Sequence, residues 1–368
     1  MINTRRSFML TTSSFAMGLV GLQTISIAGR ESLTDPGYGK LIKDKAGILD
    51  LPQHFNYEIV GRAGEEMSDG FLLPGKPDGM ASFPGSQKNQ VILVRNHEIN
   101  PAALSSQGPF GKSNERRQNL SGDYLYDGGK LSPCLGGTTT LVYDVVSKKV
   151  VHQYLSLIGT LRNCAGGPTP WGSWISCEET VVSSGGVCQH DHGWCFEVPA
   201  KEEMRLTKPI PLRAMGRFNH EAVAVEPKSG EVYLTEDRHE GLLYKFVPKT
   251  KGKLAEGGKL YALRVLGAPS LDTRNWKSQK VKIGEEFELD WIEMDEVHSP
   301  KDDLHFRSFR QGAACFLEVK ECVILWVAFI SREPTEENLF SEPNDSDLVD
   351  NCDNISVAPW DDLVLCKD

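Results

Sequence analysis

The sequence predicts an all-β protein, a β-propeller of about six blades with long inserted loops. Three observations support this prediction. Runs such as 91–94 and 231–235 are short, rich in β-branched or aromatic residues, and too brief for helices. Four segments repeat one hairpin-like pattern, and polar residues recur at matching places within it. About 340 residues after the N-terminal region leave room for six or seven blades of roughly 50 residues.

The four repeated segments are 77–98, 163–179, 219–237 and 353–368. Each opens with a polar residue, turns at Pro with Gly or Asp, and follows a largely apolar strand to a polar pair. The opening residues are Asp78, Cys164, Glu221 and Asn354, and the closing pairs are His97-Glu98, Glu178-Glu179, Glu236-Asp237 and Lys367-Asp368. A tight turn brings the two ends of a hairpin together, so hairpins arranged radially would direct these groups toward a shared axis.

Other segments supply the rest of the predicted blades. The runs 140–144, 195–198 and 243–247 are typical of outer strands. The segments 101–133 and 249–305 are rich in Gly, Lys, Ser and Asp, and we expect them to be long insertions between strands. Such loops would lie over one face of the molecule and contribute to a site.

The N-terminus resembles a twin-arginine export signal. Arg5 and Arg6 precede a mildly apolar run that ends in a small-x-small cleavage site at 26–28. We therefore expect a signal peptide at 1–28, one domain at 29–368, passage through the twin-arginine translocase, and a periplasmic or extracellular location. The apolar run is too short for a membrane anchor. A net charge of −10 argues against nucleic-acid binding, and a monomer is expected.

The repeated acids and the cysteine point to metal binding. Adjacent carboxylates resist close approach unless a cation lies between them, and hard divalent cations such as calcium prefer oxygen ligands. A thiolate among carboxylates indicates an additional, softer metal such as iron or zinc. The predicted ligands are Asp78, Glu98, Cys164, Glu178, Glu179, Glu221, Glu236 and Asp237. Arg95, Arg238 and Arg310 are candidates for binding an anionic substrate.

These residues also have simpler explanations. An acidic pair at a strand end is often a solvated edge. His97 and His220 could be core histidines, and Cys164 a small buried hydrophobic residue. The odd number of cysteines, nine, leaves at least one thiol without a partner in the chain. Cys188/Cys195 and Cys315/Cys322 could each close a hairpin, or the first pair could form a zinc-like site with His190 and His192.

Several motifs resemble those of the PhoX-type alkaline phosphatases. They are LVRNHE, NCAGGPTPWGSWISCEET, GRFNHEAVAVEP, VYLTEDR and DNISVAPWDDLVLC, and the resemblance runs from about Gly61 to the C-terminus. It implies a six-bladed propeller that hydrolyses phosphomonoesters with two ferric ions bridged by a cysteine thiolate and two or three calcium ions around them. It also implies export by the twin-arginine route.

By motif, the resemblance makes Cys164 the bridging thiolate. Glu179, Glu221 and Asp237 match the family's cluster carboxylates best, and Arg310 falls near the arginine of its R-x-E-G motif. Gln311 stands where the family has a glutamate, and Lys367 reverses a charge in its closing C-E-D. Relatives continue through further strands, so the C-terminus is expected to be truncated relative to the family.

Three functions follow from these observations. The first is a metal-dependent phosphomonoesterase with iron and calcium. The second is a calcium-dependent, lactonase-like propeller hydrolase, which would need neither the thiolate nor iron. The third is a catalytically impaired, metal-binding propeller, which the changes at Gln311 and Lys367 favour.

Overall fold

The computed structural model describes residues 39–101, 103–276, 278–282 and 285–317, together with the backbone of four strands nearer the C-terminus. The predicted export signal at 1–28 lies outside the described residues. The chain divides into two compact units, of which the first includes residues 39–58 and the second begins at residue 59. Within the described residues, no helix has the length and apolar character needed to cross a membrane.

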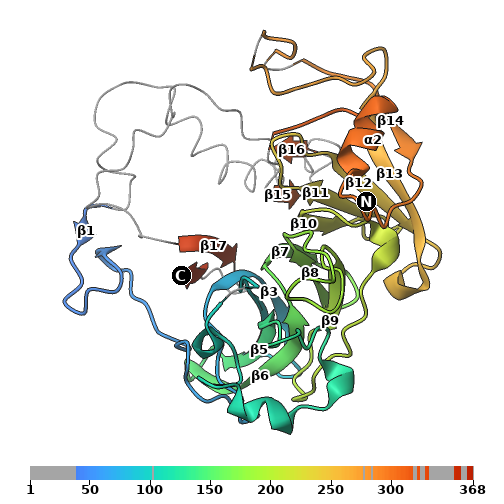
Figure 1. Cartoon of the computed structure of the whole chain (residues 1–368). Coiled ribbons are helices and arrows are strands. Elements are labelled where there is room, and N and C mark those ends of the chain that lie inside the picture. Colours follow the sequence, from blue (N-terminus) through green and yellow to red (C-terminus); the bar gives the residue numbers. More distant parts are fainter. Residues whose placement is uncertain are drawn as a thin grey trace, which may run out of the picture. The chain divides into compact units, whose positions relative to one another are not determined.

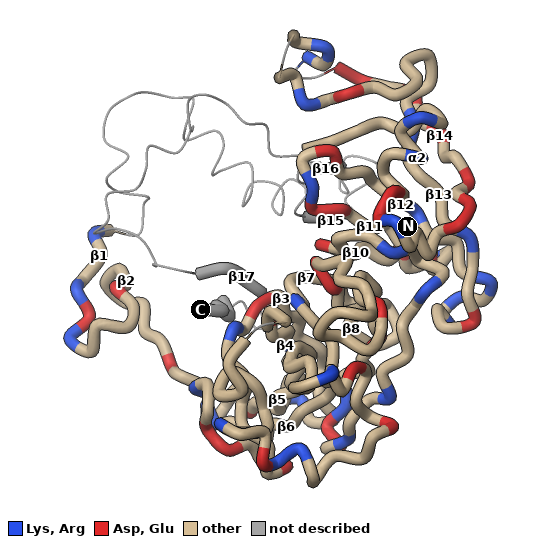
Figure 2. The backbone as a smooth tube through the Cα atoms, viewed as in Figure 1, with Lys and Arg blue, Asp and Glu red and all other residues tan. Residues whose placement is uncertain are grey.

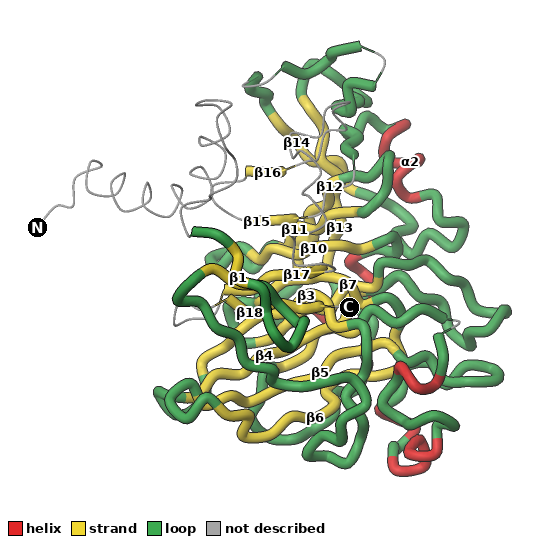
Figure 3. Tube along the Cα trace, turned by 90° about the vertical axis from the view of Figure 1, so that its left-hand side faces the viewer, coloured by secondary structure: helices red, strands yellow, loops and turns green. Residues whose placement is uncertain are grey.

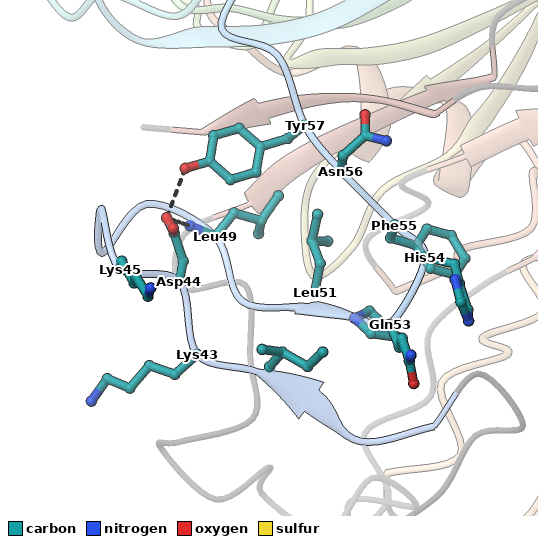
Figure 4. Close-up of a pocket in the computed structure, with 12 residues that line it drawn as sticks. Lys43, Asp44, Lys45, Leu49, Leu51, Gln53, His54, Phe55, Asn56 and Tyr57 are labelled. Atoms are coloured by element: carbon teal, nitrogen blue, oxygen red, sulfur yellow. Dashed lines mark hydrogen bonds between the residues drawn. The ribbon is translucent and has the colours of Figure 1, made fainter.

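The first unit is a small hairpin. Strands β1 (Leu41–Ile42) and β2 (Leu51–Pro52) pair in antiparallel orientation around a loop organised by Asp44. The Asp44 carboxylate accepts hydrogen bonds from the Tyr57 hydroxyl (2.7 Å) and the Ile48 backbone N–H (2.9 Å), as Figure 4 shows for Tyr57. The Tyr57 hydrogen bond and the backbone donors together lower the pKa of Asp44, so this carboxylate is a structural acceptor.

The second unit consists of antiparallel sheets in which consecutive strands pair (Figure 1). The first sheet holds β3 (Pro77–Pro84), β4 (Gln90–His97), β5 (Gly136–Asp144) and β6 (Lys149–Thr160). The second holds β7 (Asn163–Pro168), β8 (Ser173–Glu178) and β9 (Cys195–Pro199). The third holds β10 (His220–Val225), β11 (Val232–Glu236), β12 (Leu243–Pro248), β13 (Gly258–Val265) and β14 (Leu289–Glu293). Two hairpins follow, β15 (Glu321–Val323) with β16 (Ala328–Ile330), and β17 (Cys352–Val357) with β18 (Leu363–Lys367).

The first strands of these sheets lie side by side. In space β17 lies next to β3, β3 next to β7, β7 next to β10 and β10 next to β15. In Figure 3 the labels of β3, β7, β10 and β15 follow one another up the view. This is the blade arrangement of a β-propeller, with each chain segment entering its sheet at the innermost strand. The predicted fold class is confirmed, and all four repeated segments form antiparallel hairpins. The blade number of about six stays a prediction.

Apolar side chains fill the spaces between neighbouring sheets. Phe83 and Val94 of the first sheet pack with Trp174 and Phe196 of the second in one buried cluster. A larger cluster joins the second and third sheets, including Ile175, Val223, Leu234 and Phe246. Because adjacent residues such as Trp174 and Ile175 pack on opposite sides of one sheet, these strands are short, largely apolar runs, which is the pattern visible in the sequence.

The predicted insertions have different outcomes. Residues 101–133 form a loop with three 3₁₀ turns, η1 (Ser105–Gln107), η2 (Glu115–Asn119) and η3 (Gly122–Tyr124), as expected. The prediction for 249–305 was wrong, because this segment contains β13 and β14 and leads into helix α2 (Leu304–Arg310). β13 itself has the composition of a strand, but residues rich in Gly, Lys and Ser on both sides of it gave the whole segment the composition of a loop.

Candidate metal centre

A β-bulge opens each of the first three hairpins at its predicted polar residue. Two residues of the first strand oppose one residue of the second: 78–79 oppose 96, 164–165 oppose 177, and 221–222 oppose 235. A bulge redirects side chains that a regular ladder would send to alternate faces. Asp78, Cys164 and Glu221 therefore lie at equivalent bulges on three neighbouring innermost strands.

Cys164, Glu179 and Glu221 come together at these bulges. Their ligand atoms all lie within 4.8 Å of one another. The Cys164 Sγ is 3.6 Å from Glu221 Oε2 and 3.3 Å from the His220 carbonyl oxygen. In Figure 2, acidic stretches lie beside the labels of β3, β7 and β10, where the first strands meet. This cluster, Cys164–Glu179–Glu221, is called the central cluster below.

The electrostatics of the central cluster favour a bound cation. Burial, followed by the negative charges of Glu221, Glu179 and Asp78, raises the pKa of Cys164 well above its usual value. With protein groups alone the sulfur therefore keeps its proton at neutral pH. A multivalent cation would reverse that preference, because it favours a thiolate and separates the carboxylates.

Arg162 links two acids at the edge of the central cluster. Its Nε donates to Glu98 Oε1 at 3.0 Å and its Nη2 donates to Glu179 Oε2 at 2.7 Å. The Arg162 side chain is 36% exposed. Arg162 was not among the predicted site residues, although its place directly before Asn163-Cys164 was an available signal.

Asn96 holds the bulge that carries Cys164. Its Nδ2 donates to the carbonyl oxygens of Cys164 (3.0 Å) and Ala165 (2.7 Å), while its Oδ1 accepts from Trp174 Nε1 and Ser176 Oγ. The amide is fully buried and belongs to β4, so one sheet stabilises the bulge of the next.

Two glycines allow the first strands to approach so closely. A Cβ on Gly79 would lie 2.7 Å from the Cys164 carbonyl oxygen and from Ala165 Cα. A Cβ on Gly167 would lie 1.8 Å from the Val223 carbonyl oxygen of β10. The absence of a Cβ at Gly79 and Gly167 therefore permits the close approach of neighbouring strands.

Glu178 points away from the central cluster. Its carboxylate is fully buried and accepts hydrogen bonds from the backbone N–H groups of Leu161, Gly193 and Trp194 and from His192 Nδ1. Successive side chains of a strand point to opposite faces, so Glu178 contacts His192 while Glu179 lies with Cys164 and Glu221.

Glu236 and Arg238 form a separate group. The Glu236 carboxylate is buried, accepts a hydrogen bond from the Tyr244 hydroxyl, and lies 3.4 Å from Arg238 Nε. Burial raises the pKa of Glu236 to about 7, although the charge of Arg238 opposes this shift. Arg238 also donates to Asp302 at 2.5 Å. These contacts occupy Arg238 with carboxylates of the protein.

The other predicted site residues lie outside the central cluster. Asp237 is half-buried directly after β11, and its ligand atoms are not in the group that surrounds Cys164 in the described residues. Arg310 and Gln311 are exposed at the C-terminal end of α2. Arg95 donates to Thr139 Oγ1 at 3.3 Å.

The two predicted histidines are core residues with satisfied rings. His97 contacts the Gly75 carbonyl oxygen and Thr139 Oγ1, and burial lowers its pKa to about 3. His220 contacts the Gly216 carbonyl oxygen and, at 3.3 Å, the Cys195 Sγ. The simpler explanation offered for both residues agrees with these contacts.

The cysteine pairing expected from spacing is wrong for Cys188 and Cys195. Cys188 lies beside Cys134, with 3.9 Å between the sulfurs, and Cys195 lies beside Cys177 at 3.6 Å. Sequence spacing did not predict these neighbours, because Cys134 and Cys177 come from other segments of the chain than the loop that holds Cys188. The side chain of Cys322 lies outside the described residues.

A hollow in the first unit is not a candidate for this chemistry. Residues 42–57 line it, as Figure 4 shows, and its acid Asp44 is already held by hydrogen bonds. Among the described residues, none that lines this hollow belongs to a group of His, Cys, Asp or Glu side chains close enough to share a metal ion.

The fold and the central cluster place this protein in the class of β-propellers that carry a candidate metal centre on their innermost strands. A family profile described as alkaline phosphatase PhoX matches residues 36–321, and the chain belongs to this family. It is similar to the structure of Pseudomonas fluorescens PhoX in complex with vanadate, a transition state analogue, at 17% identity and a TM-score of 0.46.

That similarity covers 72% of this chain and 62% of the Pseudomonas fluorescens protein, so the chain spans less than two thirds of that relative's length. No curated protein sequence matches the chain.

Proposed function

We propose that this protein is an exported phosphatase that hydrolyses phosphate monoesters at a metal cluster containing iron and calcium. Family membership supports the phosphatase activity. The observation that carries the site is the gathering of Cys164, Glu179 and Glu221 within 4.8 Å at the bulges of neighbouring strands. Cys164 would bridge two ferric ions, and two or three calcium ions would bind around them.

The donor set fits this metal cluster. The sulfur of Cys164 suits iron, and the carboxylate oxygens of Glu179 and Glu221 suit both iron and calcium. Asp78 acts electrostatically on Cys164, and Arg162 joins Glu98 to Glu179. Asp78 and Glu98, at the two ends of the β3–β4 hairpin, would supply further oxygen donors. Asp237 completes the proposed set, whereas the hydrogen bonds of Glu178 and Glu236 give those two a structural role.

When bound, the metals would neutralise the phosphoryl oxygens and stabilise the in-line transition state. The chain's own residues prepare this site. Glu221 Oε2 accepts a hydrogen bond from the Cys164 thiol, which holds the sulfur beside the carboxylate that would share its metal. Asn96 holds the backbone of Cys164 in place. Arg162 orients Glu98 and Glu179, and its exposed part offers a positive charge to an approaching phosphate.

Turnover of p-nitrophenyl phosphate by the purified chain, reconstituted with ferric iron and calcium, tests the proposal. We expect hydrolysis that requires both metals and is lost in the Cys164→Ser variant. The Cys315→Ser variant is the matched control, because Cys315 is another buried free thiol. Equal turnover in both variants would rule out the role of Cys164.

A catalytically impaired, metal-binding propeller is the second candidate, and the exposed positions of Arg310 and Gln311 favour it. The same assay separates the two candidates. A chain that binds iron and calcium with a thiolate-to-iron colour but does not turn over the ester is the impaired form. Activity with calcium alone, unchanged in Cys164→Ser, would favour the calcium-dependent hydrolase that needs neither the thiolate nor iron.

Export by the twin-arginine translocase to the periplasm or cell exterior, as a monomer, completes the proposal. The pair Arg5-Arg6 and the small residues at 26–28 support it. Replacement of both arginines by lysine should retain the chain in the cytoplasmic fraction, and light scattering of the exported protein should give a monomer mass. Unchanged export of the lysine variant would exclude this route.

A further inference from the structure

A second group of potential ligands lies apart from the central cluster. Asp127, Cys134, Cys188 and His192 are all buried, and one ligand atom from each lies within 4.8 Å of the others. Asp127 and Cys134 come from the segment that leads into β5, and Cys188 and His192 come from the loop between β8 and β9. We call this group the inter-loop cluster.

The distances in the inter-loop cluster match the edges of a coordination tetrahedron. The sulfurs of Cys134 and Cys188 are 3.9 Å apart, Cys134 Sγ is 3.9 Å from His192 Nε2, and His192 Nε2 is 3.3 Å from Asp127 Oδ2. Metal–sulfur bonds of about 2.3 Å and metal–nitrogen or metal–oxygen bonds of about 2.1 Å give tetrahedral edges of roughly 3.8, 3.6 and 3.4 Å.

Hydrogen bonds around the inter-loop cluster orient its ligands. His192 Nδ1 lies 2.6 Å from Glu178 Oε1, and its Nε2 lies between Cys134 Sγ and Asp127 Oδ2. A ligating Nε2 would therefore have a carboxylate behind its other ring nitrogen. The Asp127 carboxylate accepts from the backbone N–H groups of Gly129, Gln189 and His190. A carboxylate behind a ligating histidine is the usual partner arrangement of zinc sites in proteins.

We propose that the inter-loop cluster binds one tetrahedral, thiophilic divalent cation of the zinc class, with two sulfur, one nitrogen and one oxygen ligand. All four ligands are buried, so no position is open to substrate, as in structural zinc sites. The cation fastens the segment that enters the first sheet to a loop of the second sheet. This site differs from the proposed iron–calcium cluster in residues, burial and role.

The neighbouring trio Cys177, Cys195 and His220 is a weaker candidate. It offers only three ligand atoms, and the second ring nitrogen of His220 contacts the Gly216 carbonyl oxygen rather than a carboxylate. It nevertheless also contains two sulfurs, so the experiment must tell the two groups apart.

Elemental analysis and zinc-edge X-ray absorption of the full chain, folded with zinc in reducing buffer, test the proposal. We expect one equivalent of zinc with two sulfur and two lighter ligands. Cobalt(II) in its place should give thiolate charge-transfer bands and the intense visible bands of tetrahedral coordination. The readout does not depend on phosphatase activity, so it remains informative if the proposed function fails.

Variants locate the zinc within the chain. Cys188→Ser should lose the zinc, whereas Cys177→Ser in the trio and His190→Gln in the same loop should keep it. If Cys188→Ser does not fold, the wild-type coordination and the retention of zinc in Cys177→Ser still decide the question. Loss of zinc from Cys177→Ser alone would overturn the proposal. So would a Cys134–Cys188 disulfide in the folded chain, or wild-type protein without zinc.

Discussion

The central and inter-loop clusters use the same kinds of ligand in different surroundings. Glu179 and Glu221 of the central cluster are half-buried, whereas every member of the inter-loop cluster is buried. Partial exposure lets a substrate reach a metal, and complete burial does not. Because Glu178 faces one cluster and Glu179 the other, a single strand end supports both a candidate reactive centre and a candidate structural one.

The largest effect should come from removing the sulfur of the central cluster. Cys164→Ser should lower phosphatase activity more than about 100-fold, because even groups behind a ligand commonly cost 10- to 100-fold when removed. Zinc in the inter-loop cluster should stay. Metal content and initial rates measure both, with Cys315→Ser as the control. Loss of zinc together with iron would mean that the two clusters are not independent.

Glu178 and Glu179 allow a reciprocal test. Glu178→Gln should weaken zinc binding by about 10- to 100-fold and leave iron unchanged, because its partner His192 belongs to the inter-loop cluster. Glu179→Gln should weaken iron and calcium binding and leave zinc unchanged. Competition with chelators measures the affinities. The same metal loss in both variants would contradict the assignment of Glu178 to the inter-loop cluster and Glu179 to the central cluster.

Close strand approach predicts a cost in stability at Gly79. A Cβ there meets backbone atoms of Cys164 and Ala165 at 2.7 Å, so Gly79→Ala should destabilise the fold by about 1–3 kcal/mol. It should also disturb the central cluster more than the inter-loop cluster. Denaturant unfolding measures the change. Gly122→Ala is the control, since a Cβ there meets nothing within 4 Å, and an equal loss in both would exclude the contact.

The smallest effect is expected at Arg162. Arg162→Lys keeps the charge but loses the two-pronged contact with Glu98 and Glu179. Because exposed ion pairs contribute about 1 kcal/mol or less, activity should fall less than about 10-fold. A rise in KM with little change in kcat would indicate contact with the substrate. A fall in kcat with unchanged KM would indicate that Arg162 acts only through the two glutamates.

The hairpins were predictable because their information is local. Short, largely apolar strands and turns at Pro with Gly or Asp predicted all four, including β17–β18. The bulges were not predictable, since each inserts an extra residue that departs from the regular register set by the apolar pattern and the turn. They explain why Cys164 and Glu221 meet, whereas alternation along the strand turns Glu178 and Glu236 elsewhere.

The sequence indicated only two of the four residues of the inter-loop cluster. Cys188 and His192 stood out in CQHDHGWC, but their partners Asp127 and Cys134 lie more than fifty residues earlier, in and just after a segment expected to be an insertion. Only the folded sheets bring the two segments together. Residue spacing therefore suggested Cys195 as the partner of Cys188, which the structure replaces with Cys134.

The buried amide of Asn96 has a bearing on how the protein is assembled. It reaches from β4 to the two carbonyl groups beside the sulfur, so β7 on its own lacks the support that fixes Cys164. The thiol proposed to bind iron can take up its final orientation only once both sheets have docked. We therefore expect the metals to be loaded late in folding, after the sheets that carry Asn96, Cys164 and Glu221 have docked.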